Sequence, residues 1–127
     1  MVQLRFATGP VIAVVVLAAF PLQAGAADKP AASAGQRIYD SECANCHGSK
    51  GKGDGEESAY LTPQPQDFTS GVIQKRSDDF LTTVIAKGGA AKGLSASMPS
   101  FPKLSQADLQ SVVAYVRQLG KGGSGKK

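Results

Sequence analysis

The sequence is poor in the residues that usually fill a large core: it has no tryptophan, and aromatic residues make up 6% of its 127 residues. A domain of roughly 100 residues buries only about two-thirds of the surface that its unfolded chain exposes. The length allows one compact domain plus a removable segment, which excludes two separate cores. So small a domain would be stabilised by a large apolar cofactor.

A long membrane-spanning segment is also absent. The N-terminal apolar run covers residues 11–20, whereas a helix needs about 20 apolar residues to cross a bilayer. Arg5 precedes this run and small residues fill positions 24–27, which is the pattern of a secretory signal peptide. We predict a signal peptide over residues 1–27, cleaved after residue 26 or 27, and a periplasmic protein with no stable membrane span. A retained membrane anchor is the alternative, which the short run disfavours.

The expected mature domain has no excess of one charge. The chain contains 14 Lys and Arg against 10 Asp and Glu. Arg5 belongs to the signal peptide and Lys121, Lys126 and Lys127 belong to a glycine-rich tail, which leaves 10 charges of each sign. Without a large basic face, binding to nucleic acid is not expected. The predicted organisation after the signal peptide is a linker over residues 28–33, one domain over residues 34–120 and a disordered basic tail over residues 121–127.

No segment alternates apolar and polar residues over the length of a strand, so the predicted fold class is all-α. Three helices are predicted, each beginning at a serine that can cap its first turn. They cover residues 34–43 after Ser33, run from Ser77 to Gly88 and Gly89, and run from Ser105 to Gly120. Residues 48–69 and 90–104 are predicted long loops, which need something to wrap.

Both cysteines and the single histidine lie in one pentapeptide, Cys43-Ala44-Asn45-Cys46-His47. The Cys-x-x-Cys-His spacing is typical of c-type haem attachment. Two thiols can add to the vinyl groups of the porphyrin, and the adjacent imidazole can reach the iron. We therefore predict one covalently bound haem c, with Cys43 and Cys46 as its thioether residues and His47 as an axial ligand of the iron.

Three other roles for the cysteine pair are disfavoured by its surroundings. A thioredoxin-like redox pair needs a βαβ context, which the sequence lacks. A zinc site needs four ligands, and two Cys and one His leave one missing. A structural disulfide across two intervening residues would constrain little chain, because disulfide stabilisation grows with loop length.

The second axial ligand is expected from a methionine. Met1 leaves with the signal peptide, so Met98 is the one that remains. It lies in a segment with Pro99 and Pro102, which stiffen the loop between two predicted helices and help to hold a thioether at a fixed distance from a metal. The alternative is a methionine that fills an ordinary gap in the core. We predict Met98 as the axial ligand opposite His47.

From about Gly35 to Leu119 the chain resembles the class I cytochrome c family, in particular its small bacterial members. In that family a glycine and an aromatic residue on the first helix pack against an aromatic residue of the last helix. Gly35, Tyr39 and Tyr115 occupy the matching positions. Further matches lie at residues 46–48, 53–55, 63–68 and 114–117. The resemblance implies a small fold of three or more helices, with long loops wrapped around one haem.

One position departs from this family. Many relatives carry a proline after Gly-Asp-Gly, in the loop whose backbone carbonyl accepts the N–H of the histidine ring, whereas this chain has Glu56. A backbone acceptor is possible with any residue there, and such a bond orients the imidazole and raises its basicity. We expect the acceptor within residues 56–65.

The predicted function is electron transfer and not enzyme catalysis. With His47 and Met98 on opposite sides, the iron has no open position for a substrate. We expect a monomer that docks briefly with redox protein donors and acceptors at an exposed haem edge. Lys87, Lys92 and Lys103 flank the Met98 segment and are expected either to steer an acidic partner or to form ordinary solvated surface.

Two alternative functions stay open. The chain could be the dedicated haem subunit of a periplasmic dehydrogenase or oxidase complex. It could also be a peroxidase-like or gas-sensing protein with a vacant iron position, although the sequence offers no second histidine and no evident distal acid-base pair.

Overall fold

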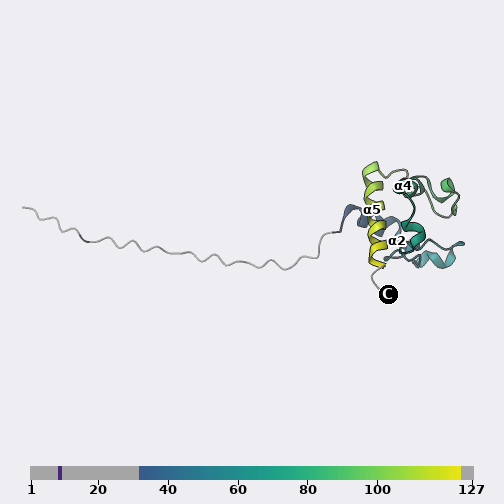
Figure 1. Cartoon of the computed structure of the whole chain (residues 1–127), viewed down its shortest axis with the longest axis horizontal. Helices are drawn as coiled ribbons and strands as arrows, with labels where there is room; N and C mark the ends of the chain where they lie inside the picture. Colours follow the sequence, from purple (N-terminus) through teal and green to yellow (C-terminus); the bar gives the residue numbers. More distant parts are fainter. Residues whose placement is uncertain (1–8, 10–31, 124–127) are drawn as a thin grey trace, which may run out of the picture.

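The computed structural model describes Gly9 and residues 32–123. Within these residues the chain is helical and contains no strand, which confirms the all-α prediction. The elements are α1 (Ala34–Glu42), α2 (Ala44–His47), the 3-10 helix η1 (Glu56–Tyr60), α3 (Gly71–Gln74), α4 (Asp78–Lys87), the 3-10 helix η2 (Gly89–Lys92) and α5 (Gln106–Gly123). Figure 1 shows α5 running the length of the domain, with α4 and α2 beside it.

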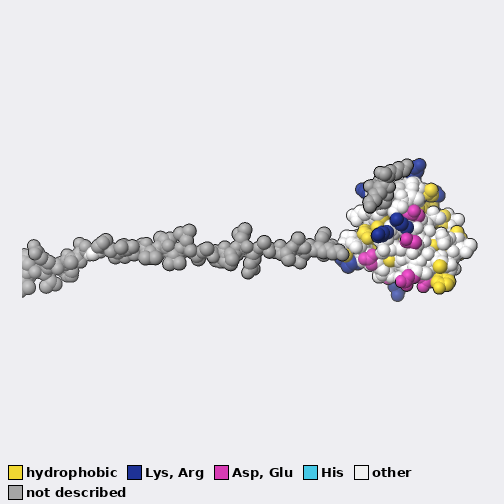
Figure 2. Space-filling model, turned by 90° about the horizontal axis from the view of Figure 1, so that it is seen from below, with side chains coloured by type: hydrophobic (Ala, Val, Ile, Leu, Met, Phe, Trp, Pro, Cys, Tyr) yellow, Lys and Arg dark blue, Asp and Glu magenta, His cyan; other side chains and the backbone are white. Residues whose placement is uncertain are grey.

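Parts of the predicted organisation fall outside this description. The predicted signal peptide, except Gly9, and the predicted linker up to residue 31 lie outside the described residues, as do residues 124–127 of the predicted tail. In the described part of the chain, no helix is both long and apolar enough to pass through a bilayer. On the face that Figure 2 presents, positive and negative side chains are interspersed.

The first and last helices cross at close range because residue 35 has no side chain. A Cβ atom at Gly35 would lie 2.0 Å from the carbonyl oxygen of Ser111 in α5. One turn later, Tyr39 is completely buried, and its ring centroid lies 5.2 Å from that of Tyr115. Ser33 caps α1 by accepting a hydrogen bond of 3.1 Å from the backbone N–H of Gln36. The predicted first helix and its contact with the last helix are confirmed.

The core is formed by one face each of α1, α4 and α5, together with Ile73 of α3. Its buried side chains are those of Tyr39, Ile73, Leu81, Ile85, Leu109, Val112, Val113 and Val116. Those in α4 and α5 recur every three or four residues, the spacing of a single helix face. As predicted, Ser77 caps α4 by accepting from the N–H of Phe80 at 3.1 Å, and Gly88, with a φ of 84°, follows its last residue.

Arg117 of α5 ties the last helix to the segment that leads into α4. Its guanidinium lies 2.7 Å from a carboxylate oxygen of Asp78. It also donates hydrogen bonds to the backbone carbonyls of Ile73, Gln74 and Arg76. An exposed ion pair alone contributes little, but the planar guanidinium fixes several donors at once. The segment that contains α3 is therefore fastened to α5.

The last helix extends beyond its predicted end. It continues through Gly123, so Gly120 does not stop it, and residues 121–123 of the predicted tail are helical. A glycine usually ends a helix by adopting a positive φ, and Gly120 is not among the described glycines that do so. Instead, a Cβ atom at Gly120 would lie 2.2 Å from Cδ of Gln74. This glycine permits close packing rather than termination.

The two predicted loops contain short helical turns that were not predicted. The helix η1 falls inside the first loop and η2 overlaps the start of the second, while α3 follows the first loop. Each has only four or five residues, so a period of 3.6 residues cannot show in the sequence. The remainder of both segments consists of turns, bends and irregular backbone.

Candidate functional site

The predicted site residues line one cavity of about 480 Å³. Cys43, Cys46 and His47 reach it from the end of α1 and from α2, and Met98 reaches it from the loop after η2. The remaining lining residues are Glu42, Leu61, Pro63, Gln64, Pro65, Gln66, Gly93, Leu94, Ser95, Ser97, Pro99 and Phe101. The structure thus brings together two sequence segments that were predicted separately.

The local backbone explains how α1 delivers the cysteines. Cys43 caps the end of α1, where its N–H donates to the carbonyl of Tyr39 at 2.9 Å, and it also begins α2. Gly48 closes α2 with a φ of 77°, a conformation that favours glycine. The hydroxyl of Tyr39 then donates to the carbonyl of Gly48 at 2.7 Å. The motif is therefore held at both ends by the most buried residue of α1.

The imidazole of His47 is fixed by two contacts. Its Nδ1 donates to the backbone carbonyl of Gln66 at 3.2 Å. Its ring stacks on that of Phe68, with centroids 4.3 Å apart and an interplanar angle of 21°. Burial lowers the pKa of His47, while the hydrogen bond to Gln66 acts in the opposite direction. The neutral ring that donates through Nδ1 keeps Nε2 as the nitrogen that can bind a metal.

The range predicted for the acceptor of this hydrogen bond ends one residue before the observed acceptor. We expected it within residues 56–65, and the structure has the carbonyl of Gln66. The reason lies in the glycine-rich turn after α2. The N–H of Gly53 donates to the carbonyl of His47 at 2.9 Å, and a Cβ atom at Gly53 would lie 2.3 Å from the carbonyl oxygen of Pro65. Pro65 therefore packs on the turn, and the next carbonyl reaches the ring.

Met98 is half-buried and its backbone is anchored to the start of η2. Its carbonyl accepts a hydrogen bond of 3.1 Å from the N–H of Gly89, and its N–H donates to the carbonyl of Ser95 at 3.3 Å. A Cβ atom at Gly89 would lie 2.2 Å from the same Ser95 carbonyl. Met98 also packs against the hydrophobic core. It lines the cavity and contacts the core, so both roles weighed from the sequence have a structural counterpart.

The thiol of Cys43 does not have the lowered pKa of a redox-active cysteine. Both thiols are free rather than joined in a disulfide. Burial, together with the neighbouring Glu42 and Cys46, raises the pKa of Cys43 to about 12. A thioredoxin-like pair needs a lowered thiol pKa. Among residues 32–123, no three His, Cys, Asp or Glu side chains gather as a zinc site would need.

The donor set and its surroundings fit a c-type haem. Two free thiols, an oriented imidazole and a thioether face one cavity. Leu61, Pro63, Leu94 and Phe101 give that cavity an apolar lining, and its volume lies in the range of cofactor sites. Cys43, Cys46 and His47 would hold the porphyrin and iron from one side, and Met98 from the other.

Sequence reasoning missed part of this site. The carbonyl of Gln66 is a backbone group, so no residue type in the sequence marks it. Leu61 and Leu94 stand in segments without a regular period, so no pattern in the sequence marks them as lining residues. Phe68 offers the one usable signal, because an aromatic residue in a loop rich in Gly and Pro needs a partner to pack against.

The chain is similar to known proteins over most of the described domain. A family model described as Cytochrome c matches residues 32–120. The chain is 34% identical over 100 residues to the Cbb3-type cytochrome c oxidase subunit CcoP of Rhodobacter capsulatus, covering 76% of this chain and 32% of that subunit. It is 31% identical over 96 residues to the subunit FixP of Azorhizobium caulinodans, covering 75% of this chain and 29% of that subunit.

A much shorter relative matches over almost its whole length. Cytochrome c-554(547) of Halothiobacillus neapolitanus is 30% identical over 89 residues, which are 69% of this chain and 96% of that protein. The chain thus spans about a third of the length of the oxidase subunits that it matches. In this family the cofactor is a covalently bound haem c with its iron, and Cys43 and Cys46 fit the attachment motif. The chain belongs to the class I cytochrome c family, whose haem serves electron transfer.

Proposed function

We propose that the chain is a periplasmic mono-haem c-type cytochrome that carries single electrons between redox proteins. Cys43 and Cys46 form the thioether bonds to the haem, and His47 and Met98 are the two axial ligands of the iron. The observation that carries the proposal is the convergence of these four side chains, from two distant segments, on one apolar cavity.

The residues around the cavity have separate tasks in this proposal. The carbonyl of Gln66 holds the ring of His47 in one orientation and raises its basicity. Met98 is a soft donor, which raises the reduction potential relative to harder ligands. The apolar lining disfavours the extra charge of oxidised iron and shifts the potential in the same direction. When bound, the haem iron takes up and releases one electron.

Ligation on both sides favours transfer over catalysis. With His47 and Met98 in place, no iron position is left for a substrate, and partners exchange electrons at the cavity mouth. We expect a monomer that docks through a small contact of less than about 1,200 Å², the size typical of redox encounters. Lys87, Lys92 and Lys103, which flank the Met98 segment, are exposed. They are placed to steer an acidic partner.

The test is to express the chain in a periplasm together with haem-attachment machinery. We expect a red protein whose mass equals the processed chain plus one haem, and whose haem survives acid-acetone extraction. The spectrum of the oxidised protein should show the far-red charge-transfer band of sulfur-ligated ferric iron. Extractable haem would contradict the thioether bonds, and a cytoplasmic product without haem attachment machinery should stay colourless.

A second candidate is a dedicated electron-transfer subunit of a larger redox complex. It is favoured by the similarity to proteins named as oxidase subunits, CcoP and FixP. Native purification from the source cell distinguishes the two. A free carrier elutes at the mass of one small chain, whereas a subunit co-purifies in a fixed ratio with a larger oxidoreductase.

A further inference from the structure

The side-chain amide of Gln74 joins two parts of the molecule that are distant in sequence. Its Nε2 donates to the backbone carbonyl of Phe68 at 2.6 Å and to that of Val116 in α5 at 3.3 Å. Gln74 lines no part of the haem cavity. It nevertheless fastens to α5 the residue whose ring stacks on His47.

The segment held by this amide is the one that orients His47. Residues 66–68 supply both contacts of the imidazole, the carbonyl of Gln66 and the ring of Phe68. Phe68 is fixed through its N–H, which donates to the carbonyl of Gly51 at 2.6 Å, and through its carbonyl, which accepts from Gln74. A shift of Phe68 therefore moves the neighbouring Gln66 carbonyl relative to Nδ1 of His47.

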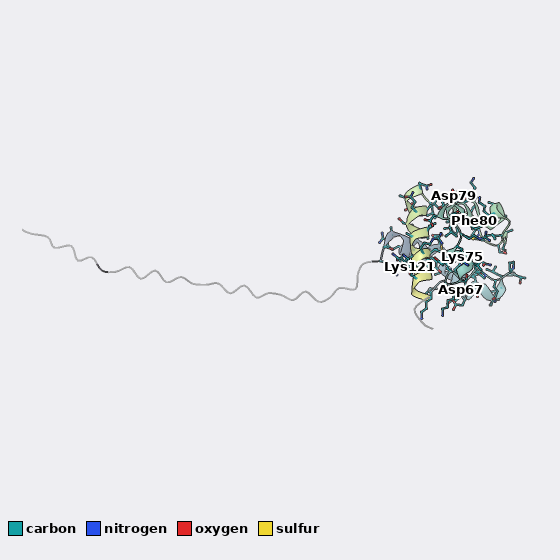
Figure 3. All side chains as sticks on the ribbon, in the orientation of Figure 1. Asp67, Lys75, Asp79, Phe80 and Lys121 are labelled. Carbon is teal, nitrogen blue, oxygen red and sulfur yellow. The ribbon has the colours of Figure 1, made fainter. Side chains whose placement is uncertain are left out.

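Gln74 is itself held from both ends. Arg117 donates to its backbone carbonyl at 3.0 Å. At the other end, Gly120 leaves room for its amide, since a Cβ atom there would lie 2.2 Å from Cδ and 2.3 Å from Nε2. Figure 3 shows the neighbourhood, with Asp67 and Lys75, the residues next to Phe68 and Gln74, labelled close to Lys121 at the C-terminal end of α5. The amide has little freedom to turn away from Phe68.

We propose that Gln74 is a positioning residue that sets the hydrogen bond between Gln66 and His47, and through it the reduction potential of the haem. The inference rests on the proposed ligation of iron by His47. A hydrogen bond at Nδ1 makes the imidazole a stronger donor and favours the oxidised iron. Loss of the Gln74 amide loosens that bond, so the potential rises. We expect a rise of at most about 59 mV, which equals a tenfold change in a one-electron equilibrium.

Two substitutions test the proposal, one at Gln74 itself and one at the glycine that makes room for its amide. Gln74→Leu removes the donor and keeps most of the volume. Gly120→Ala keeps the glutamine but pushes its amide away from Phe68, and it also favours the helix, because alanine has a higher helix propensity than glycine. The matched controls are Gln118→Leu, exposed on α5, and Gly122→Ala, where an added Cβ meets nothing within 4 Å.

Three measurements are made on each holoprotein: the reduction potential, the exchange rate of the Nδ1 proton of His47 by NMR, and the thermal unfolding temperature. We expect both test variants to raise the potential and to speed proton exchange, and both controls to match the wild type. Since Gly120→Ala favours the helix, it keeps the test open even if Gln74→Leu is too unstable to purify. If potential and exchange stay at the wild-type values while only the unfolding temperature falls, Gln74 is a packing residue and the inference is wrong.

Gln74→Glu separates hydrogen bonding from packing. The introduced carboxyl donates to Phe68 only when it is protonated. Exchange of the His47 Nδ1 proton should therefore be faster than in the wild type at neutral pH and return toward the wild-type rate in acid, while Gln74→Leu shows no such return. Failure of the proposed function looks different, because the wild type itself would then lack the spectrum of iron bound by histidine and methionine.

Discussion

The two sides of the cavity are held in different ways. The histidine side, residues 43–68, folds back on itself: Gly53 donates to the carbonyl of His47, Gly55 to that of Cys46, and Phe68 to that of Gly51. The methionine side, residues 88–101, rests on another element. The bond from Phe101 to Ile85 joins it to α4, and the bond from Gly89 to Met98 lies within the methionine side itself.

The histidine side and the methionine side also differ in how deeply their residues are buried. Gly48, Gly51 and Gly53 are buried inside the turn of the histidine side, whereas most residues around Met98 are exposed. A side that is closed by its own hydrogen bonds keeps its geometry when the other side changes. We therefore expect haem attachment and iron ligation by methionine to be separable, and the predictions below test that separation from the largest effect to the smallest.

The largest effect is expected from His47→Ala. It removes the imidazole, the stack on Phe68 and the bond to Gln66 in one step. Because cofactor binding supplies much of the folding free energy in such proteins, holoprotein should nearly disappear from the periplasmic fraction. Haem staining and intact mass measure this, with Ser49→Ala in the adjacent exposed turn as the control. A normal yield of attached haem would show that the histidine side does not depend on its ligand.

Met98→Ala should leave haem attached through Cys43 and Cys46, because that side is held without it. The reduction potential should fall, the far-red charge-transfer band should vanish, and imidazole or cyanide should bind the ferric iron. Visible spectra and potentiometry measure these changes, and Ser100→Ala, in the same loop but outside the cavity lining, is the control. An unchanged spectrum would mean that Met98 serves the core alone, and a vacant position would favour the sensor or peroxidase function.

A pair of glycine substitutions compares the two sides directly. In Gly89→Ala the new Cβ meets the carbonyl of Ser95 at 2.2 Å, and in Gly53→Ala it meets that of Pro65 at 2.3 Å. Overpacking of this kind costs about 1–3 kcal/mol of stability, and Gly53→Ala adds backbone strain because Gly53 has a φ of 75°. Gly89→Ala should speed imidazole binding, whereas Gly53→Ala should speed exchange of the His47 Nδ1 proton.

The control for this pair is Gly71→Ala, where an added Cβ meets nothing within 4 Å. Stopped-flow ligand binding and NMR distinguish the outcomes. If either variant disturbs both sides equally, the two sides form one cooperative unit and the comparison above is wrong.

The difference between the sides also explains what the sequence could predict. The helices were predictable because their caps and apolar faces are local features: Ser33, Ser77 and the periodic residues of α4 and α5 need no knowledge of the rest of the fold. The attachment motif was predictable for the same reason. The two thiols and the imidazole of the histidine side all lie within five consecutive residues.

What could not be predicted depends on contacts between distant segments. The carbonyl of Gln66 reaches His47 because Gly53 lets Pro65 approach. Gly120 has the composition of a helix end but serves to admit the side chain of Gln74. Neither fact is visible locally, because both depend on which segment packs on which.

The smallest effect is expected at a cap that lines neither side of the cavity. Asp108 accepts hydrogen bonds from the N–H and hydroxyl of Ser105, at 3.1 and 2.7 Å, and these bonds lower the pKa of its carboxyl. Because the folded-state pKa is lowered, the stabilisation is present above the unfolded pKa and is lost as pH falls through the folded one. Asp108→Asn should slightly lower the unfolding temperature at neutral pH, and the difference from the wild type should disappear in acid. The reduction potential and the binding of imidazole should stay unchanged. A shift in either would show that the start of α5 is coupled to the haem site.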